Sequence, residues 1–323
     1  MAQRVRYRQL PTEQRHSHSD ELDRLPTIEL LRLMHREDAH LTRAVGAALP
    51  TIARATRLIV SSLEQGGRLF FIGAGTSGRL GVLEAAECPP TFSISPSLVQ
   101  AIIAGGRNAV FRSREGAEDT RSEARTTVRQ RVRRGDVVVG IAASGVTPFV
   151  DEALRTASHR GARTILLTCN PQALIPAECR IILSVGPELL TGSTRLKAGT
   201  ATKLVLNMLT LSTMIRLGKT YGNLMIDVRP TSRKLLARAR HIVQSVLGCS
   251  EDTAAIALRN ARGHAKAAIL MAAEPLSYHT ACRRLNEARG SLREALRLQR
   301  AARNGHAQHT MRLSRRRNAL HDT

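Results

Sequence analysis

Aromatic residues and lysine are both scarce in this chain of 323 residues. Phe, Trp and Tyr together make up 2% of the sequence and Trp is absent, so few side chains can stack on nucleic-acid bases. The formal net charge of +23 comes almost entirely from arginines spread along the whole chain, because only five lysines are present. Solvated, arginine-rich surfaces explain this charge better than a nucleic-acid site does, so we expect no nucleic-acid partner.

Cysteine and long apolar runs are also scarce. The five cysteines are scattered without a CxxC pair, a pattern that predicts neither a disulfide framework nor a zinc site. No run of 18 apolar residues occurs, and the N-terminus lacks the apolar core of a signal peptide. We therefore expect a cytoplasmic protein with reduced thiols, no metal ion and no membrane contact.

Short apolar runs alternate with helical stretches through the first two thirds of the chain. Such runs are typical of strands buried on both faces, and their alternation with helices predicts a doubly wound parallel α/β sheet flanked by helices. The expected strands are 68–72, 99–104, 137–142, 163–168 and 180–185.

Apolar residues at helical spacing lie on both sides of these strands. Thr27 is expected to cap a helix over 28–40, and a second helical stretch over 41–65 contains Pro50, which would kink or split it. An apolar helix is expected over 200–217.

Four segments follow from this pattern. They are an N-terminal segment with helices over 1–50, an α/β domain over 51–225, a small helical C-terminal module over 226–298, and a basic tail over 299–323. Within the module, residues 250–296 are expected to form three or four short helices. The tail is expected to be disordered, because it is polar and strongly charged.

The first expected strand runs into a loop of Gly, Ser and Thr that opens a helix. The loop 73–78 matches GxGxxG, a motif that is weak evidence when it stands alone. Hydroxyl groups on Thr76 and Ser77 join the free N–H groups and partial positive charge of a helix N-terminus beside Gly78. This combination suits a phosphate group of modest size.

A dinucleotide fits this loop less well than a phosphomonoester does. A nicotinamide site needs an acidic residue at the end of the next strand, about 20 residues or more past the glycines, to hold the ribose. That strand ends at 103–106 in Ile-Ala-Gly-Gly, without a carboxylate. No lysine follows the loop, which also excludes a Walker A site. We therefore expect no cofactor.

A second loop of the same build follows the third expected strand. It contains Ser144, Gly145 and Thr147, at the start of a helix that Pro148 preorganises. Helix capping by Thr147 would explain one hydroxyl group, but not two Ser/Thr-Gly loops at equivalent strand ends, where open α/β sheets bind ligands. The two loops together predict one bound phosphosugar.

Several blocks occur in one order along residues 12–296: GAGTSGRLGVLEAAECPPTF, IAGG, EGAED, DVVVGIAASGVTP, TCNP, TGSTRLKAGTATKLVLNML and GKTYGNLMIDV. With them the chain resembles the N-acetylmuramic acid 6-phosphate etherases, bacterial relatives of the glucokinase regulatory protein within the sugar isomerase (SIS) domain superfamily. The resemblance implies a homodimer that recycles cell-wall sugars. Its reaction would convert N-acetylmuramic acid 6-phosphate and water to N-acetylglucosamine 6-phosphate and D-lactate.

The implied reaction needs one base and one acid. In the open-chain sugar the C2 proton is α to an aldehyde, so a base can remove it and lactate can leave C3, after which water adds to the unsaturated aldehyde. By the resemblance, Glu87 in AAECPP protonates the leaving oxygen and Glu118 in EGAED is the base. Both could instead be solvated carboxylates, and Glu115 competes with Glu118 because spacing does not separate them.

The block TGSTRLKAGT opens the long apolar helix and, by the same resemblance, forms a third wall of the pocket. Ser193, Thr194 and Lys197 are its candidate substrate ligands. Either Arg195 or Lys197 could meet the lactate carboxylate or the phosphate. Helix capping by Thr194, with solvated basic side chains, explains this block nearly as well.

The chain departs from the family pattern at several positions. Val146 and Phe149 replace an Arg and a Tyr in the second loop, His16 replaces an Asn, and 289–291 replaces the motif GGF. These changes could alter substrate affinity, although the candidate acid and base remain. A non-catalytic sugar-phosphate sensor with the same pocket is the main alternative, and a nicotinamide oxidoreductase is disfavoured by the missing ribose carboxylate.

Overall fold

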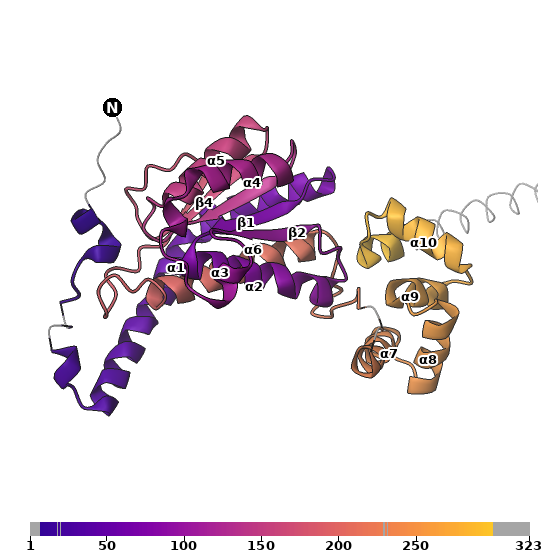
Figure 1. The fold of residues 1–323 in the computed structure, drawn as a ribbon. Helices are drawn as coiled ribbons and strands as arrows, with labels where there is room; N and C mark the ends of the chain where they lie inside the picture. Colours follow the sequence, from indigo (N-terminus) through magenta and orange to yellow (C-terminus); the bar gives the residue numbers. More distant parts are fainter. Residues whose placement is uncertain (1–6, 18, 20, 229, 231, 300–323) are drawn as a thin grey trace, which may run out of the picture. The chain divides into compact units, whose positions relative to one another are not determined.

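The chain folds into two compact units (Figure 1). The computed structural model describes residues 7–17, 19, 21–228, 230 and 232–299. The first unit comprises the residues up to Pro89 together with Ile94–Thr213, and the second comprises Pro90–Ser93 and the residues from Met214 onward. The expectation of a disordered tail concerns residues that, after Gln299, lie outside the described part of the chain.

A five-stranded parallel sheet forms the centre of the first unit, which confirms the predicted fold class. The strands β1, β3 and β4 are buried almost throughout, which explains why their sequences are continuous apolar runs. The sheet order is β2-β1-β3-β4-β5, and all neighbouring strands are parallel. The strands are β1 (Leu69–Gly73), β2 (Val99–Ile103), β3 (Val137–Ile141), β4 (Arg163–Thr168) and β5 (Cys179–Ile182).

Helices cover both faces of this sheet. Figure 1 shows α4 and α5 on one face, and α1, α2 and α6 on the other, with the short α3 beside α2. Alternate side chains of β1 point to opposite faces of the sheet. Phe70 packs with the apolar residues of α4 and α5 on one face, while Phe71 faces Gly81 of α2 on the other. The helices are α1 (Thr27–Glu64), α2 (Gly75–Phe92), α3 (Asn108–Phe111), α4 (Arg121–Arg131), α5 (Pro148–His159) and α6 (Lys197–Arg216).

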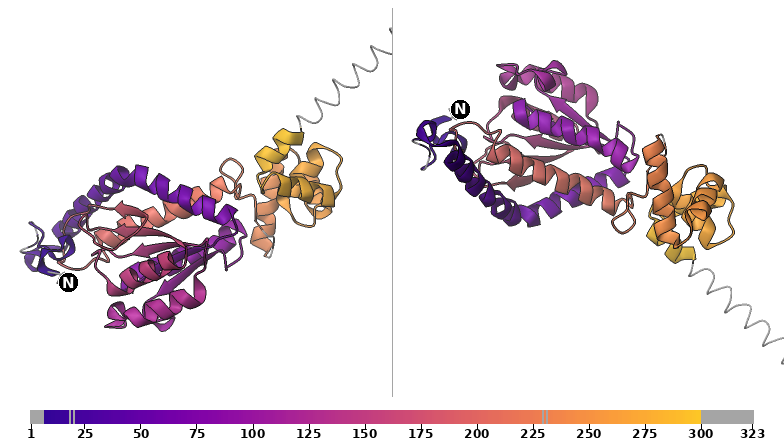
Figure 2. Two further views of the ribbon diagram at one scale, coloured as in Figure 1. Left: turned by 90° about the horizontal axis from the view of Figure 1, so that it is seen from above. Right: turned by 90° about the horizontal axis from the view of Figure 1, so that it is seen from below.

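One continuous helix stands where two were predicted. Helix α1 is 38 residues long and contains Pro50 in its interior, and Figure 2 shows it unbroken along the sheet. Thr27 is its first residue, with Pro26 in the cap position, so the prediction of a Thr27 cap is wrong as well. Buried residues continue on both sides of Pro50, and their packing offsets the hydrogen bond that a proline removes. They include Leu41, Val45, Ile52 and Ile59.

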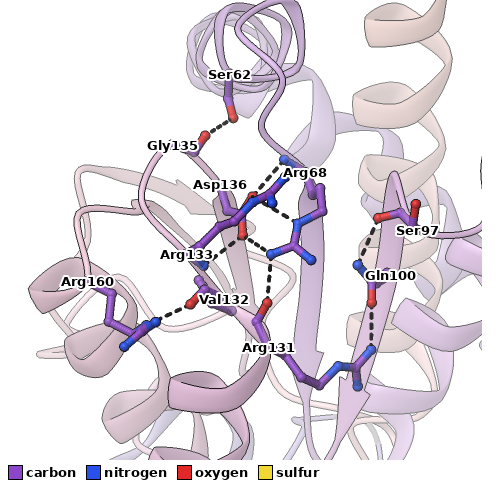
Figure 3. Close-up of polar contacts among 10 residues, drawn as sticks. All are labelled: Ser62, Arg68, Ser97, Gln100, Arg131, Val132, Arg133, Gly135, Asp136 and Arg160. Carbon is purple, nitrogen blue, oxygen red and sulfur yellow. Dashed lines mark hydrogen bonds and ion pairs between the residues drawn. The ribbon is translucent and has the colours of Figure 1, made fainter.

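A buried carboxylate ties together the amino ends of β1 and β3 (Figure 3). Asp136 is fully buried and accepts the backbone N–H groups of Arg68 and Arg133, each at 2.9 Å. The guanidinium Nη2 of Arg68 also donates to Asp136 at 2.7 Å. Because every oxygen of this carboxylate is paired, the network supports the sheet at the end opposite to the two Ser/Thr loops.

The second unit is helical. The prediction of three or four short helices over 250–296 is confirmed by α8, α9, α10 and the helical residues 292–299. Buried Lys266 joins its loops, since Nζ donates to the carbonyl oxygens of Gly218 at 2.8 Å and Gly290 at 2.7 Å and pairs with Asp227 at 2.8 Å. The helices are α7 (Arg233–Leu247), α8 (Glu251–Asn260), α9 (Ala265–Ala273) and α10 (Tyr278–Glu287).

No helix in the described part of the chain combines the length and the apolar character that a membrane span requires.

Candidate functional site

A pocket opens at the carboxyl ends of β1 and β3, with a volume of about 570 Å³. These two strands lie side by side in the sheet, and the chain leaves them in opposite directions, toward β2 on one side and β4 on the other. Ligands of open α/β sheets bind at such a switch point. Both predicted phosphate loops contribute to the lining, so the fold brings them to one site.

The first loop is short because α2 begins at Gly75, two residues after β1 ends. Thr76 and Ser77 line the pocket from the first turn of α2, where the free backbone N–H groups of the helix also lie. Gly78 does not line the pocket. It supports the loop, because a Cβ atom at this position would lie 2.6 Å from the carbonyl oxygen of Gly73.

The second loop places Ser144 and Thr147 on the opposite wall of the pocket. Gly145 between them has a φ of +71°, and a Cβ atom there would lie 2.5 Å from the Cβ atom of Ala173. Thr147 precedes α5, but within the described structure its side chain makes no capping hydrogen bond. Capping therefore does not explain this threonine, which lines the pocket.

Residues at the end of β4 hold the second loop in place. The amide Nδ2 of Asn170 donates to the carbonyl oxygen of Ser144 at 2.8 Å, and Thr168 Oγ1 donates to the carbonyl oxygen of Ala143 at 3.3 Å. The backbone N–H of Asn170 in turn donates to Thr168 Oγ1 at 3.1 Å. The TCNP block thus positions the serine loop from outside the pocket.

An acidic segment forms another wall. Glu115, Glu118 and Asp119 all line the pocket, and all three are exposed to solvent. Glu118 and Asp119 belong to a short 3-10 helix, Ala117–Asp119, which follows Gly116 in the left-handed region with a φ of +71°. The predicted base and its competitor Glu115 therefore face the same space as the phosphate loops.

Glu87 lies apart from this pocket. It is an exposed residue of α2, whereas the described pocket lining takes residues of that helix only from Gly75 to Arg79. Glu87 is twelve positions beyond Gly75, which at 1.5 Å per residue is about 18 Å along the helix axis. One chain by itself does not place the predicted acid in the same pocket as Glu118.

The third predicted wall contributes fewer residues than expected. Gly192 and Thr194 line the pocket, whereas Ser193 and Lys197 do not. Lys197 is buried, and its Nζ atom pairs with Glu37 of α1 at 2.7 Å, so its charge is directed away from the site. The expectation that this lysine meets the substrate is corrected by this pairing.

Glu37 joins the start of α6 to the N-terminal segment. Besides Lys197, it contacts His16, with 3.0 Å between His16 Nε2 and Glu37 Oε2. Burial raises the pKa of Glu37, but hydrogen bonds from Lys197 and His16 outweigh burial and leave this pKa below its ordinary value. At the same helix start, Glu188 accepts the backbone N–H groups of Lys197 and Ala198 at 2.9 Å each, and burial raises the pKa of Glu188.

The N-terminal segment adds residues to the pocket that the sequence motifs did not predict. Thr12 and Glu13 line the pocket, and the backbone N–H of Gly192 donates to the carbonyl oxygen of Thr12 at 3.1 Å.

Two arginines, Arg79 and Arg114, line the pocket too. Arg79 belongs to the GTSGR block and Arg114 directly precedes EGAED, so their places beside predicted site motifs were the sequence features that could have identified them.

The cysteines offer no nucleophile at this site. Burial raises the pKa of the Cys88 thiol to about 12, with nearby Glu84 adding to the effect. Burial together with Glu188 does the same for Cys169, whose pKa is also about 12. Both thiols are therefore protonated at neutral pH. In the described residues, no group of three or more His, Cys, Asp or Glu side chains is arranged to hold a metal ion.

Comparisons with known proteins cover most of the chain. The family model of the glucokinase regulatory protein N-terminal SIS domain matches residues 51–158, and the SIS domain model matches residues 118–212. The chain is 51% identical to an N-acetylmuramic acid 6-phosphate etherase of Cutibacterium acnes, over 88% of this chain and 95% of the relative. It is 48% identical to N-acetylmuramic acid 6-phosphate etherase 2 of Vibrio cholerae, over 89% of this chain and 94% of the relative.

Solved structures show only a distant likeness. A phosphoheptose isomerase from Francisella tularensis matches 59% of this chain and 100% of its own, with 17% identity and a TM-score of 0.47. A likeness of this size does not bear on function.

Proposed function

Because the chain belongs to the N-acetylmuramic acid 6-phosphate etherase family, we propose that it cleaves the D-lactyl ether of N-acetylmuramic acid 6-phosphate. The products are N-acetylglucosamine 6-phosphate and D-lactate, and the enzyme is a carbon–oxygen lyase of cell-wall sugar recycling. The observation that carries this proposal is the pocket in which two Ser/Thr-Gly loops face a carboxylate-bearing wall.

The phosphate group binds between the two loops. Thr76 and Ser77 on one side, and Ser144 and Thr147 on the other, present hydroxyl groups to its oxygens. The free N–H groups and the partial positive charge at the start of α2 add to this attraction. Thr194 completes the lining beside the first turn of α2.

Glu118 is the base in this mechanism. It removes the C2 proton of the open-chain sugar, where the neighbouring aldehyde stabilises the negative charge that develops. The electron pair forms the C2–C3 double bond and the C3–O bond breaks, so lactate leaves with the ether oxygen. Water then adds at C3 and a proton returns to C2, which restores the saturated sugar.

Glu87 is the proposed acid, and its position leads us to propose a homodimer as the active form. Leu83, one turn earlier on α2, is 44% exposed, so the helix surface around Glu87 presents apolar area to solvent. A second copy packed on this surface would bury Leu83 and could receive Glu87 beside its own Glu118. The acid of each site then comes from the neighbouring subunit.

We also propose that the reaction takes place in the cytoplasm. All five cysteines lie in the described residues as free thiols, which suits a reducing compartment.

A sugar-phosphate sensor without turnover is the second candidate, and the separation of Glu87 from the pocket favours it. The two candidates differ in one measurement, the release of D-lactate from N-acetylmuramic acid 6-phosphate by the purified chain in the presence of EDTA. The lyase predicts release that falls by roughly 10²–10⁴-fold in Glu118→Gln, the usual contribution of a general base. Saturable binding of the phosphosugar without release by the wild type would instead identify a sensor.

A further inference from the structure

We infer that the two arginines of the pocket sort the two anionic groups of the substrate. Arg79 binds the phosphate group, and Arg114 binds the carboxylate of the lactyl group. This inference rests on the proposed function, because only a lactyl sugar phosphate carries both anions.

The charges of the pocket create the need for such residues. Four carboxylates line the pocket: Glu13, Glu115, Glu118 and Asp119. A substrate with a phosphate dianion and a carboxylate therefore enters a site whose negative charges repel both groups. The hydroxyl groups of the two loops donate hydrogen bonds but carry no charge. Within the described lining, Arg79 and Arg114 are the cationic side chains. Lys197 is paired with Glu37 instead, and Arg195 lies outside the lining.

Arg79 is held in place and still has donors to spare. Its Nε atom donates to the carbonyl oxygen of Val110 in α3 at 2.9 Å. Among the described residues the two terminal nitrogens have no other partner, and the side chain is half-buried. Arg79 follows Thr76 by three positions on α2, so the two residues lie on the same face of the helix.

Arg114 is held on the acidic wall of the pocket, in the segment that follows α3. Its Nη1 atom donates to the carbonyl oxygen of Gly105 at 3.2 Å. Its Cδ atom packs against Gly105, where a Cβ atom would lie only 2.9 Å away. The side chain is exposed, and in the described structure it forms no ion pair with Glu115, Glu118 or Asp119, so its remaining donors are available to a ligand of the pocket.

The chemistry of the substrate decides which arginine takes which anion. The lactyl group sits on C3, next to C2 where Glu118 acts, and Arg114 lies four residues before Glu118 on the same wall. The phosphate group sits on C6, at the far end of the sugar, and Arg79 shares its helix turn with the phosphate-binding hydroxyl groups. A guanidinium fork also matches the planar geometry of a carboxylate.

Two probes separate the two roles. N-Acetylglucosamine 6-phosphate carries the phosphate group alone, and N-acetylmuramic acid carries the carboxylate alone. Dissociation constants for both are measured by calorimetry with the wild type, Arg79→Gln and Arg114→Gln, so the measurement does not depend on turnover. We expect Arg79→Gln to weaken the phosphate probe about tenfold or more, and Arg114→Gln to weaken the carboxylate probe similarly, because each loses charge-assisted hydrogen bonds. The other probe is little affected in each case.

Arg112→Gln is the matched control, because Arg112 is an exposed arginine of the same segment outside the pocket lining. It should change neither constant. Arg79→Lys separates the charge from the contact with α3. Lysine keeps the positive charge but loses the Nε hydrogen bond to Val110, so this variant should retain part of the affinity for the phosphate probe. Equal weakening of both probes by either variant, or no weakening, would overturn the inference. Failure of the wild type to release D-lactate would refute the proposed function separately.

Discussion

At the scale of single residues, the side chains that touch the proposed substrate depend on others that do not. Ser144 lines the pocket, but its backbone is held by the amide of Asn170 from outside. Asn170 is buried, so the hydrogen bond has little competition from water. The position of one proposed phosphate ligand is therefore set by a residue in the loop after β4.

Replacing Asn170 should weaken substrate binding more than turnover. Asn170→Ala removes the hydrogen bond to Ser144 and should raise KM by roughly 2–10-fold, the usual worth of one hydrogen bond, with a smaller change in kcat. Gln172→Ala is the control, because this exposed side chain lies two residues further along and outside the lining. Steady-state kinetics decide the point, and an unchanged KM in Asn170→Ala would contradict the supporting role.

Glu37 should make stability depend on pH in acid. Its folded pKa lies below its ordinary value of 4.5 because Lys197 and His16 favour the charged form. A depressed pKa gives stability that is present above pH 4.5 and is lost as the pH falls through the folded pKa. Urea unfolding of Glu37→Gln should therefore show a shallower loss of stability in this acid range than the wild type does. The exposed Glu64→Gln should follow the wild type, and identical slopes for Glu37→Gln and wild type would refute the expectation.

At the scale of elements, the pocket requires two glycine-containing loops of fixed shape at neighbouring strand ends. The second loop turns at Gly145, where both the positive φ and the nearby Ala173 exclude a side chain. Gly186 has almost the same φ, +70°, but no described atom lies within 4 Å of a Cβ atom placed there. The two glycines thus separate the cost of the backbone conformation from the cost of a clash.

Gly145→Ala should cost more stability than Gly186→Ala. The backbone conformation alone costs about 1–2 kcal/mol for a residue with a Cβ atom, which is the expected loss for Gly186→Ala. Gly145→Ala adds the displacement of Ala173, and it should also weaken phosphosugar binding because Ser144 and Thr147 move with the loop. Chemical denaturation and binding measurements test both expectations. Equal losses of unfolding free energy in the two variants would show that the clash with Ala173 is relieved without a further loss of stability.

The elements that could be predicted from sequence are those with local signals. Apolar runs marked all five strands to within a few residues, and Ser/Thr-Gly patterns marked both loops. The continuity of α1 through Pro50 could not be predicted, because packing against the sheet outweighs the local preference of proline. The burial of Lys197 had no local signal either, since its partner Glu37 lies 160 positions earlier in the chain.

At the scale of the whole molecule, the proposed base lines the pocket of the chain and the proposed acid does not. Glu118 lines the pocket, while Glu87 is exposed on α2 beyond the described lining. If a second subunit supplies Glu87, mixing two inactive variants should restore activity. A dimer of Glu87→Gln with Glu118→Gln contains one site in which both carboxylates are native.

The activity that such mixing should restore can be calculated. Random exchange of subunits makes half of the dimers mixed, each with one of its two sites complete, so roughly a quarter of wild-type activity should return. The measurement is D-lactate release after the two variants are co-expressed or exchanged. The double variant Glu87→Gln/Glu118→Gln mixed with wild type is the control for exchange. No recovery would show that acid and base act within one chain.

Elimination followed by hydration in this pocket would break the C3–O bond of a lactyl sugar phosphate. The most direct measurement is incubation of the wild type with N-acetylmuramic acid 6-phosphate in water enriched in oxygen-18, followed by mass spectrometry of both products. We expect D-lactate without label, because it keeps the ether oxygen, and label at C3 of N-acetylglucosamine 6-phosphate. Labelled lactate, or no lactate at all, would contradict it.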